Sequence, residues 1–241
     1  MAATARFRLG NPWCQREWVN MNQPTVFGAA YSVYVRTVRL TLAEKRVPYH
    51  LVEIDVFEEG GPPPDYLARH PFGRIPAFEH DGFRLYETDA IVRYIDEAFE
   101  GPSLIPDTSR GRARMTQAMR ILDCYAYPSM VWGVYFEQVG APREGRETDP
   151  VRLDGAISQS RTCLQALEGL SDGGPFLVGP ELCLADLLAA PMFAYFRLAP
   201  RGRHLLAEHS RLTSWWQRML VRPSMTATRS PLESQIEDSY P

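Results

Sequence analysis

The chain has 241 residues, a hydrophobic fraction of 45% and a formal net charge of −3. This length fits one large domain or two small ones, and the apolar content is that of a globular protein with a core. The weakly acidic balance argues against a nucleic-acid-binding protein. No apolar run approaches the roughly 18 residues that span a bilayer, and the N-terminus lacks the character of a secretory signal. We therefore expect a cytoplasmic protein with no membrane partner.

The four cysteines are far apart in the sequence, at Cys14, Cys124, Cys163 and Cys183. Because there is no Cys-x-x-Cys pair, the pattern indicates neither a redox dithiol nor a zinc cluster. We expect buried structural thiols and no bound metal.

Residues 1–22 share no pattern with the rest of the chain, and we expect a loosely ordered extension there. After it, residues 25–28 are typical of a strand, 33–46 have the apolar spacing of a helix, and 49–56 alternate as a second strand. A β-α-β unit implies two parallel strands joined by a right-handed crossover. Consecutive Gly and Pro residues from Gly60 to Pro64 then predict a loop.

The most informative stretch runs from His70 to Ile91. Pro76 interrupts an apolar run, and a proline there belongs at the first residue of a strand, on an edge or at a bulge. Asp81-Gly82 predicts a hairpin turn before a second strand over 83–86, and a helix pattern comes next. Residues 23–100 should therefore form a small mixed four-stranded sheet with helices on both faces.

Residues 101–109 are typical of a linker, and beyond them the strand signals fade. Helical spacing over 116–138, 151–170, 184–196 and 212–220 predicts an all-α domain over 110–241. Pro128 should kink the first of these helices because it removes a backbone hydrogen bond. The polar end, 229–241, should be frayed or draped over the surface.

The stretch around Pro76 suits recognition of a peptide. A tight turn at Arg74-Ile75-Pro76, with a cis Ile75–Pro76 bond as one option, would turn the Ile75 N–H and C=O outward, where an extended ligand could pair as an added strand. Unpaired amides at the next helix start favour a ligand carboxylate, to which the Thr88 hydroxyl can add a bond. The Glu87 carboxylate can hold an ammonium group. The structural alternative is a plain hairpin with Thr88 as helix cap.

Ser32 lies at the start of the first helix, where a hydroxyl can cap the helix or donate a hydrogen bond to a bound thiolate. The sequence alone favours the cap, and Tyr31 and Tyr34 are rival hydroxyl donors. No Gly-x-Ser-x-Gly elbow surrounds Ser32, which argues against a serine hydrolase. In the helical part, Tyr125 and Tyr127 belong to an unusually aromatic helix and could face either the core or a cleft.

Together these motifs resemble the cytosolic glutathione transferases, most closely serine-type members such as the phi class. The resemblance covers about 25–230 and rests on seven segments: Val26-Phe-Gly-Ala-Ala-Tyr-Ser32, Arg36-Thr-Val-Arg-Leu-Thr-Leu-Ala-Glu-Lys45, Pro71-Phe-Gly-Arg-Ile-Pro-Ala-Phe78, Glu87-Thr-Asp-Ala-Ile91, Phe176-Leu-Val-Gly179, Ala185-Asp-Leu187 and Trp215 through Arg222-Pro-Ser224. It implies a thioredoxin-like N-terminal domain, an all-α C-terminal domain that carries the electrophile site, and a homodimer.

The resemblance also implies that Ser32 stabilises the thiolate of glutathione, the co-substrate. By the same comparison, the Ile75 backbone beside cis-Pro76 pairs with the cysteinyl unit, and Glu87 and Thr88 bind the γ-glutamyl end. Arg74 occupies a position that often contributes a polar side chain. Tyr31, Tyr125 and Tyr127 are the candidates for the electrophile site.

The sequence departs from the family pattern at three places. Thr88 replaces the usual serine but keeps the hydroxyl. Gly60 to Pro64 occupies the region where phi members carry basic residues for the glycyl carboxylate, so that contact would come from elsewhere, such as Arg69. Cys183 stands where the family has a Ser or Thr helix cap paired with Asp186.

The expected function is conjugation of glutathione to an electrophilic, apolar or aromatic small molecule, as in detoxification. The alternatives on the same scaffold are glutathione-dependent thioether cleavage, dehalogenation or isomerisation, because a fold does not fix a reaction. A non-catalytic glutathione-binding protein is a further alternative, which the altered loop favours and Ser32 opposes. A thiol–disulfide oxidoreductase would need a cysteine near position 32, and the sequence has none there.

Overall fold

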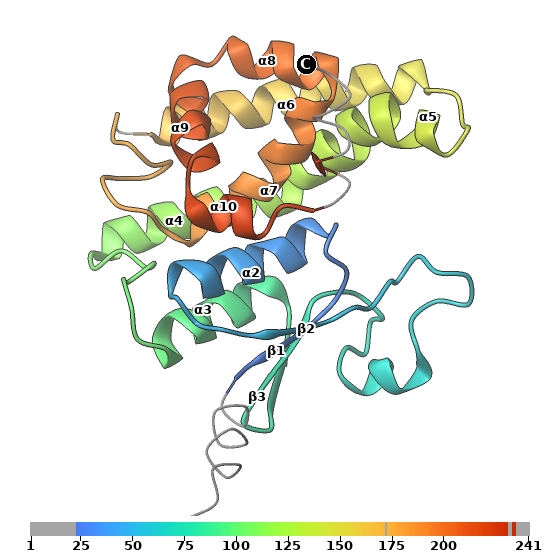
Figure 1. Ribbon diagram of the computed structural model, residues 1–241. Coiled ribbons are helices and arrows are strands. Elements are labelled where there is room, and N and C mark those ends of the chain that lie inside the picture. The colour runs from blue at the N-terminus through green and yellow to red at the C-terminus, as the bar shows by residue number, and fades with distance from the viewer. Residues whose placement is uncertain (1–22, 172, 231–232, 235–241) are drawn as a thin grey trace, which may run out of the picture.

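The computed structural model describes residues 23–171, 173–230 and 233–234, so the expected extension over 1–22 lies outside the described residues. The described chain forms two parts stacked on each other, a small sheet with its helices and a larger group of helices (Figure 1). Among the described residues, no helix is both long and apolar enough to cross a bilayer.

The first part contains a four-stranded mixed sheet, which confirms the expected fold class. Its elements are β1 (Thr25–Phe27), α2 (Val33–Glu44), β2 (His50–Val52), the 3₁₀ helix η1 (Pro64–Ala68), β3 (Ala77–His80), β4 (Phe83–Tyr86) and α3 (Thr88–Ala98). The strand order is β2-β1-β3-β4; β1 pairs parallel with β2 and antiparallel with β3, and β3 pairs antiparallel with β4.

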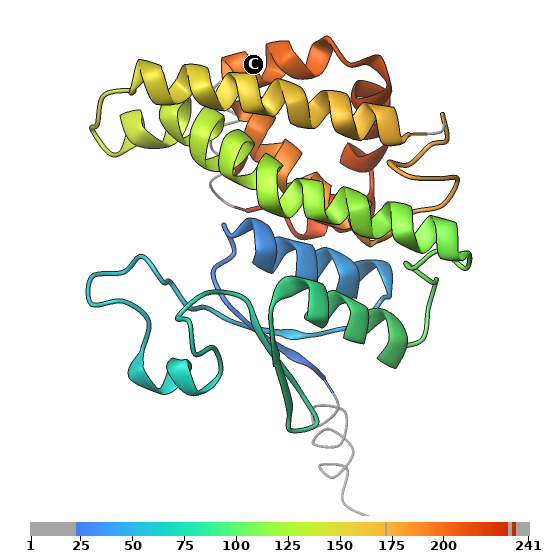
Figure 2. The same ribbon diagram turned by 180° about the vertical axis from the view of Figure 1, so that it is seen from behind.

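Two expectations about this part are wrong. The second strand ends at Val52 rather than at residue 56. Helices do not cover both faces of the described sheet, because α2 and α3 pack together on the face turned toward the helical part (Figures 1 and 2). The segment after β2 that could have supplied the other helix is rich in Gly and Pro, and it forms only the short η1.

The peptide bond between Ile75 and Pro76 is cis, and Pro76 immediately precedes β3. Pro76 therefore needs no N–H for the strand ladder, as the sequence predicts. The β3–β4 hairpin turns at Asp81 and Gly82, both with positive φ (50° and 77°), as a two-residue turn of this twist requires. The turn and the hairpin fix the register that pairs Ala77 with Tyr86.

The second part is helical: α4 (Ser109–Ile121), η2 (Leu122–Gly140), α5 (Ala141–Arg143), α6 (Pro150–Leu170), α7 (Leu184–Leu198), α8 (Pro200–Ala207), α9 (Ser210–Leu220) and α10 (Pro223–Ala227). The helix expected from residue 116 begins earlier, at Ser109, because the Thr108 side chain caps it by accepting from the Gly111 N–H. Pro128, which was expected to kink this helix, lies within η2, which has π-type hydrogen bonding.

The core of the helical part is α7, which is almost entirely buried and packs on both η2 and α2. At its start the fully buried Asp186 accepts hydrogen bonds from the Cys183 and Leu177 N–H groups, both at 2.9 Å, and from the Trp215 indole at 2.8 Å. One carboxylate thus joins the start of α7, the segment before it and α9.

The expectations for the cysteines and the C-terminal end need correction. Cys163 and Cys183 are buried, but Cys124 is exposed, because it lies on the outer side of η2. Ser230 and Glu233, within the segment expected to be frayed, are 2% and 3% exposed, and Glu233 pairs with the buried Arg36 of α2. The ion pair with Arg36 fixes this part of the chain against α2, and residue type alone does not indicate such a contact.

Candidate functional site

Two adjoining cavities lie where the sheet part meets the helical part. The smaller cavity, of about 230 Å³, lies between the start of α3 and the α4–η2 helix. The larger cavity, of about 980 Å³, lies between the start of α2, the segment after β2 and the wall formed by η2 and α5. Tyr34, Arg74 and Ile75 line both cavities, so one extended ligand can occupy the two together.

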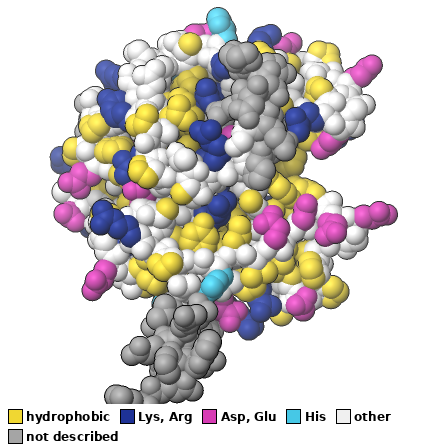
Figure 3. All heavy atoms as spheres, in the orientation of Figure 1, with side chains coloured by type: hydrophobic (Ala, Val, Ile, Leu, Met, Phe, Trp, Pro, Cys, Tyr) yellow, Lys and Arg dark blue, Asp and Glu magenta, His cyan; other side chains and the backbone are white. Residues whose placement is uncertain are grey.

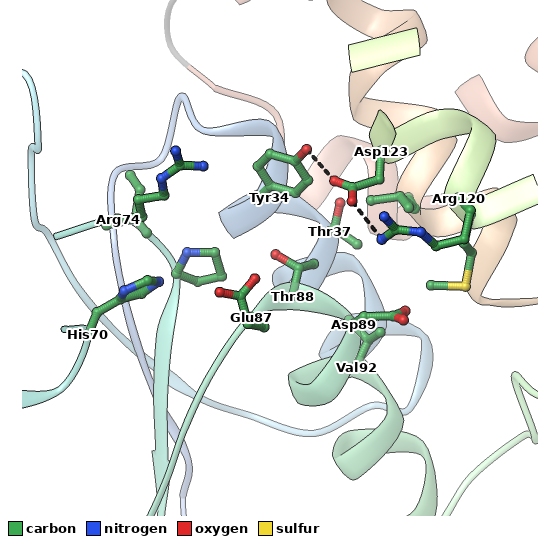
Figure 4. Close-up of a pocket in the computed structure, with 14 residues that line it drawn as sticks. Tyr34, Thr37, His70, Arg74, Glu87, Thr88, Asp89, Val92, Arg120 and Asp123 are labelled. Carbon is green, nitrogen blue, oxygen red and sulfur yellow. Dashed lines mark hydrogen bonds and ion pairs between the residues drawn. The ribbon is translucent and has the colours of Figure 1, made fainter. Parts of the chain in front are cut away.

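The smaller cavity has an acidic group and a helix start side by side. Glu87 and Thr88 both line it and lie next to each other in Figure 4. Glu87 has a φ of 70°, which is uncommon for a residue other than glycine and is typical of backbone held by its surroundings at a site. Its exposed carboxylate has no hydrogen-bond or ion-pair partner among the described residues. The arrangement can hold an ammonium group on Glu87 and a carboxylate at the start of α3.

The turn at Ile75 presents its backbone to both cavities. The Tyr66 hydroxyl donates to the Arg74 carbonyl at 2.7 Å and fixes the turn. Within the described residues, the Ile75 N–H and C=O have no hydrogen-bond partner. Gly28 at the end of β1 permits the close approach, since a Cβ there would lie 3.1 Å from the Ile75 Cβ and 2.4 Å from the Val35 Cγ2. The free backbone groups can pair with an extended ligand.

Both rival tyrosine hydroxyls are bonded to carboxylates. The Tyr34 hydroxyl donates to Asp123 at 2.7 Å, and Arg120 donates to the same carboxylate at 2.9 Å (Figure 4). The Tyr31 hydroxyl donates to Asp55 at 2.6 Å. Burial, together with these hydrogen bonds, raises the pKa of both tyrosines well above the ordinary value. Neither hydroxyl proton is available to a bound thiolate in this arrangement.

Ser32 has both features that the sequence suggested. Its Oγ caps α2 by accepting from the Val35 N–H at 3.4 Å, and its side chain lines the larger cavity. A hydroxyl can accept in the cap and still donate its own proton, and no acceptor for that proton is present among the described residues. Ser32 is therefore placed to donate to a thiolate at the start of a helix.

The larger cavity is mainly aromatic. Its aromatic lining residues are Tyr31, Tyr34, Phe57, Phe72, Tyr127, Trp132, Tyr135, Phe136 and Tyr195. Of the three candidates for an electrophile site, Tyr31 and Tyr127 line this cavity, whereas Tyr125 lines neither cavity and is 56% exposed. Residues two apart on a helix point to nearly opposite sides, so Tyr125 and Tyr127 cannot face the same space.

Arg69, the suggested partner for the glycyl carboxylate, lines neither cavity. Its guanidinium lies over the Phe27 ring at 4.6 Å, and its Nε is 3.7 Å from Glu79. The cation common to both cavities is Arg74 instead, which the sequence did suggest as a contact.

The sequence analysis missed five polar residues of the smaller cavity: Thr37, His70, Asp89, Arg120 and Asp123. His70 is 2% exposed, its Nδ1 is buried without a hydrogen-bond partner, and its ring points toward Glu87 in Figure 4. Burial lowers its pKa below the ordinary value despite the opposing charge of Glu87. The position of His70 directly before the Pro-Phe-Gly-Arg motif was the available signal. Arg120 and Asp123 come from the other part of the chain, and no local pattern marks them.

Comparison with known proteins identifies the family. The sequence model of the glutathione S-transferase N-terminal domain matches residues 26–103, and that of the C-terminal domain matches 150–218. A probable glutathione S-transferase of Oryza sativa subsp. japonica, GSTF1, is 28% identical over 208 residues, covering 85% of this chain and 94% of the relative.

Solved structures agree with this assignment. The structure of glutathione S-transferase III in apo form aligns with a TM-score of 0.76 at 28% identity, covering 86% of this chain and 95% of that one. Glutathione transferase F7 from Populus trichocarpa aligns with the same TM-score and identity, covering 85% and 97%. The chain belongs to the glutathione transferase family and is similar to its phi-class members.

Proposed function

We propose that this glutathione transferase uses Ser32 to stabilise the glutathione thiolate and conjugates it to an electrophilic, apolar or aromatic small molecule. One observation carries the assignment of Ser32. Its hydroxyl lies at the cavity with a proton free to donate, whereas the two rival hydroxyls, of Tyr31 and Tyr34, are bonded to carboxylates.

Glutathione fits the two cavities in one orientation. Its γ-glutamyl ammonium group pairs with Glu87, and its γ-glutamyl carboxylate meets the Thr88 hydroxyl and the amides that open α3. The cysteinyl backbone pairs with Ile75 beside cis-Pro76, which directs the sulfur into the larger cavity toward Ser32. Arg74, which lines both cavities, is the cation available to a carboxylate of the tripeptide.

The chemistry then requires no covalent bond to the protein. A free thiol has a pKa near 8.5, and a donated hydrogen bond at a helix start lowers it toward neutrality, which increases the thiolate fraction. The thiolate sulfur attacks the electrophilic carbon and forms the C–S bond, while the leaving group departs with its bonding electrons. Holding both reactants in one cavity supplies the remaining rate enhancement.

Ultraviolet titration of bound glutathione tests this assignment. The wild type should show a thiol pKa well below that of free glutathione, and Ser32→Ala should lose the shift. Tyr31→Phe and Tyr34→Phe are matched controls that also remove one hydroxyl each, and both should keep it. Because Ser32→Ala also removes a helix cap, worth about 1 kcal/mol, thermal unfolding must show that the variant stays folded. Tight binding with an unshifted pKa in the wild type would favour a non-catalytic binding protein.

We also propose a cytoplasmic homodimer that acts in detoxification. The family resemblance suggests the dimer, and an exposed aromatic pair supports it: Phe72 and Tyr86 are 70% and 38% exposed. Phe72 and Tyr86 also contact each other, with ring centroids 6.2 Å apart. Sedimentation velocity at micromolar concentration should give a dimer, and a monomer alone would refute the proposal.

A further inference from the structure

The acidic and the basic side chains around the larger cavity differ in whether they have partners. Four charged side chains line it: Asp55, Arg74, Arg143 and Glu144. The Asp55 carboxylate accepts from the Tyr31 hydroxyl at 2.6 Å and from the Phe57 N–H at 2.8 Å. The Glu144 carboxylate lies 3.7 Å from Arg146, so both acids of the lining are engaged.

The two arginines, in contrast, have no ion pair. Among the described residues, neither the Arg74 nor the Arg143 guanidinium has a hydrogen-bond or ion-pair partner. The two arginines lie at different places. Arg74 is in the turn before cis-Pro76 and lines both cavities, so a carboxylate of the bound glutathione can serve as its partner. Arg143 ends α5 in the helical part and lines only the larger cavity. A cation remains there that the proposed glutathione contacts do not use.

Aromatic rings form the wall next to Arg143. The Trp132 and Phe136 rings of η2 have centroids 5.4 Å apart, and Phe57 packs edge-on against Trp132 with centroids 5.9 Å apart. Gly140, one turn after Phe136, leaves space for that ring, because a Cβ there would lie 2.5 Å from it. Figure 3 shows hydrophobic side chains at the notch between the two parts of the molecule. The wall favours a planar aromatic group with its charged end toward Arg143.

We propose that the electrophile is an aromatic compound that carries a carboxylate, and that Arg143 binds this carboxylate and so determines specificity. This inference rests on the proposed function. In the test reaction, the thiolate sulfur attacks the ring carbon that bears chlorine, the C–S bond forms, and chloride leaves with the bonding electrons. Arg143 takes no part in these bond changes and acts on binding alone.

A matched pair of electrophiles tests the inference: 4-chloro-3-nitrobenzoate and its neutral amide, 4-chloro-3-nitrobenzamide. At saturating glutathione, kcat/KM for each is divided by its uncatalysed rate constant, which removes the difference in ring reactivity. Arg143→Gln should lower the benzoate value about tenfold, the loss expected for one charge-assisted hydrogen bond, and leave the amide within about twofold. Arg143→Lys should recover part of the loss.

Arg203→Gln is the matched control. Arg203 is an exposed arginine of α8 in the helical part, and like Arg143 it has no ion-pair or side-chain hydrogen-bond partner among the described residues, but it does not line the cavity. Its substitution should change neither electrophile's value by more than about twofold. If Arg203→Gln matched the effect of Arg143→Gln, the loss would reflect the general charge of the surface and overturn the proposal.

A second measurement separates the inference from the proposed function. The S-aryl glutathione conjugates of the two compounds are titrated by calorimetry, with no turnover needed. The carboxylated conjugate should bind about tenfold more tightly than the amide, and Arg143→Gln should abolish the difference. Equal affinities of the two conjugates for the wild type would overturn the inference. If Arg143→Gln weakened the binding of both conjugates and of glutathione equally, Arg143 would bind the glycyl carboxylate, and the inference would be overturned as well. The proposed function fails separately, if bound glutathione shows no thiol pKa shift.

Discussion

Removing one partner of the buried ion pair between Arg36 and Glu233 should destabilise the protein more than most single substitutions do. The two side chains are 2% and 3% exposed. The Arg36 guanidinium also donates to the Met225 carbonyl at 3.1 Å and to the Thr228 hydroxyl at 3.3 Å. Burial lowers the pKa of Arg36 below its ordinary value, while the charge of Glu233 opposes this shift. The cation therefore depends on its carboxylate partner.

Glu233→Gln keeps the shape of the side chain and removes its charge. Removing one partner of a buried pair leaves the other charge uncompensated, which costs about 3–5 kcal/mol in comparable cases, so about 3 kcal/mol is expected for a substitution that still provides an acceptor. In a chain of this length, 1 kcal/mol corresponds to about 2–4 °C in Tm, and the midpoint should therefore fall by about 6–12 °C.

Differential scanning calorimetry at pH 7 measures this shift. Glu208→Gln is the control, because it breaks an ion pair with Arg161 at the exposed surface, where such pairs contribute little. The double variant Arg36→Met, Glu233→Leu should recover much of the loss, since a hydrophobic replacement removes both charges together. A Glu233→Gln midpoint no lower than that of Glu208→Gln would refute the reasoning.

Three further outcomes are expected. Burial raises the pKa of Glu44, but hydrogen bonds from Arg222 and Ser224 outweigh it and the net shift is downward. The stabilisation that the ionised Glu44 contributes is therefore complete above its unfolded pKa of about 4.3 and is lost as the pH falls. The Tm gap between wild type and Glu44→Gln should consequently narrow from pH 6 to pH 3. Glu87→Ala should weaken glutathione binding in calorimetric titration about tenfold with little change in Tm, because its carboxylate faces the cavity; unchanged affinity would count against the ligand assignment. Cys183→Ser should not lower Tm, since a hydroxyl is a better helix cap than a thiol, and a clear decrease would contradict this.

The local features of the site were predictable from the sequence because short-range chemistry fixes them. A proline before a strand, an Asp-Gly turn and a hydroxyl at a helix start each have a direct backbone consequence. The structure has all three, at Pro76, at Asp81-Gly82 and at Ser32. These features also carried the family resemblance, which supplied the overall fold.

Other features depended on partners distant in the sequence. From the sequence alone, the hydroxyl of Tyr31 or Tyr34 could donate to a thiolate. In the fold, Tyr31 donates to Asp55 instead, and Tyr34 donates to Asp123, which is 89 residues away in the sequence. Likewise, nothing near Glu233 in the sequence shows that it is buried, since its partner Arg36 lies 197 residues earlier. Helical spacing placed Tyr125 and Tyr127 on one helix, but only packing decided which of them faces the cavity.

The sequence by itself determined where the strands and most helices lie, the proline turn before β3 and the residues that open α2 and α3. These depend on backbone geometry within a few residues. Only the tertiary structure decided which hydroxyl is free, which charges are paired and that Arg143 is left without an ion-pair partner among the described residues. Hydrogen bonds and ion pairs depend on distances between atoms, and folding alone sets those distances for residues far apart in the chain.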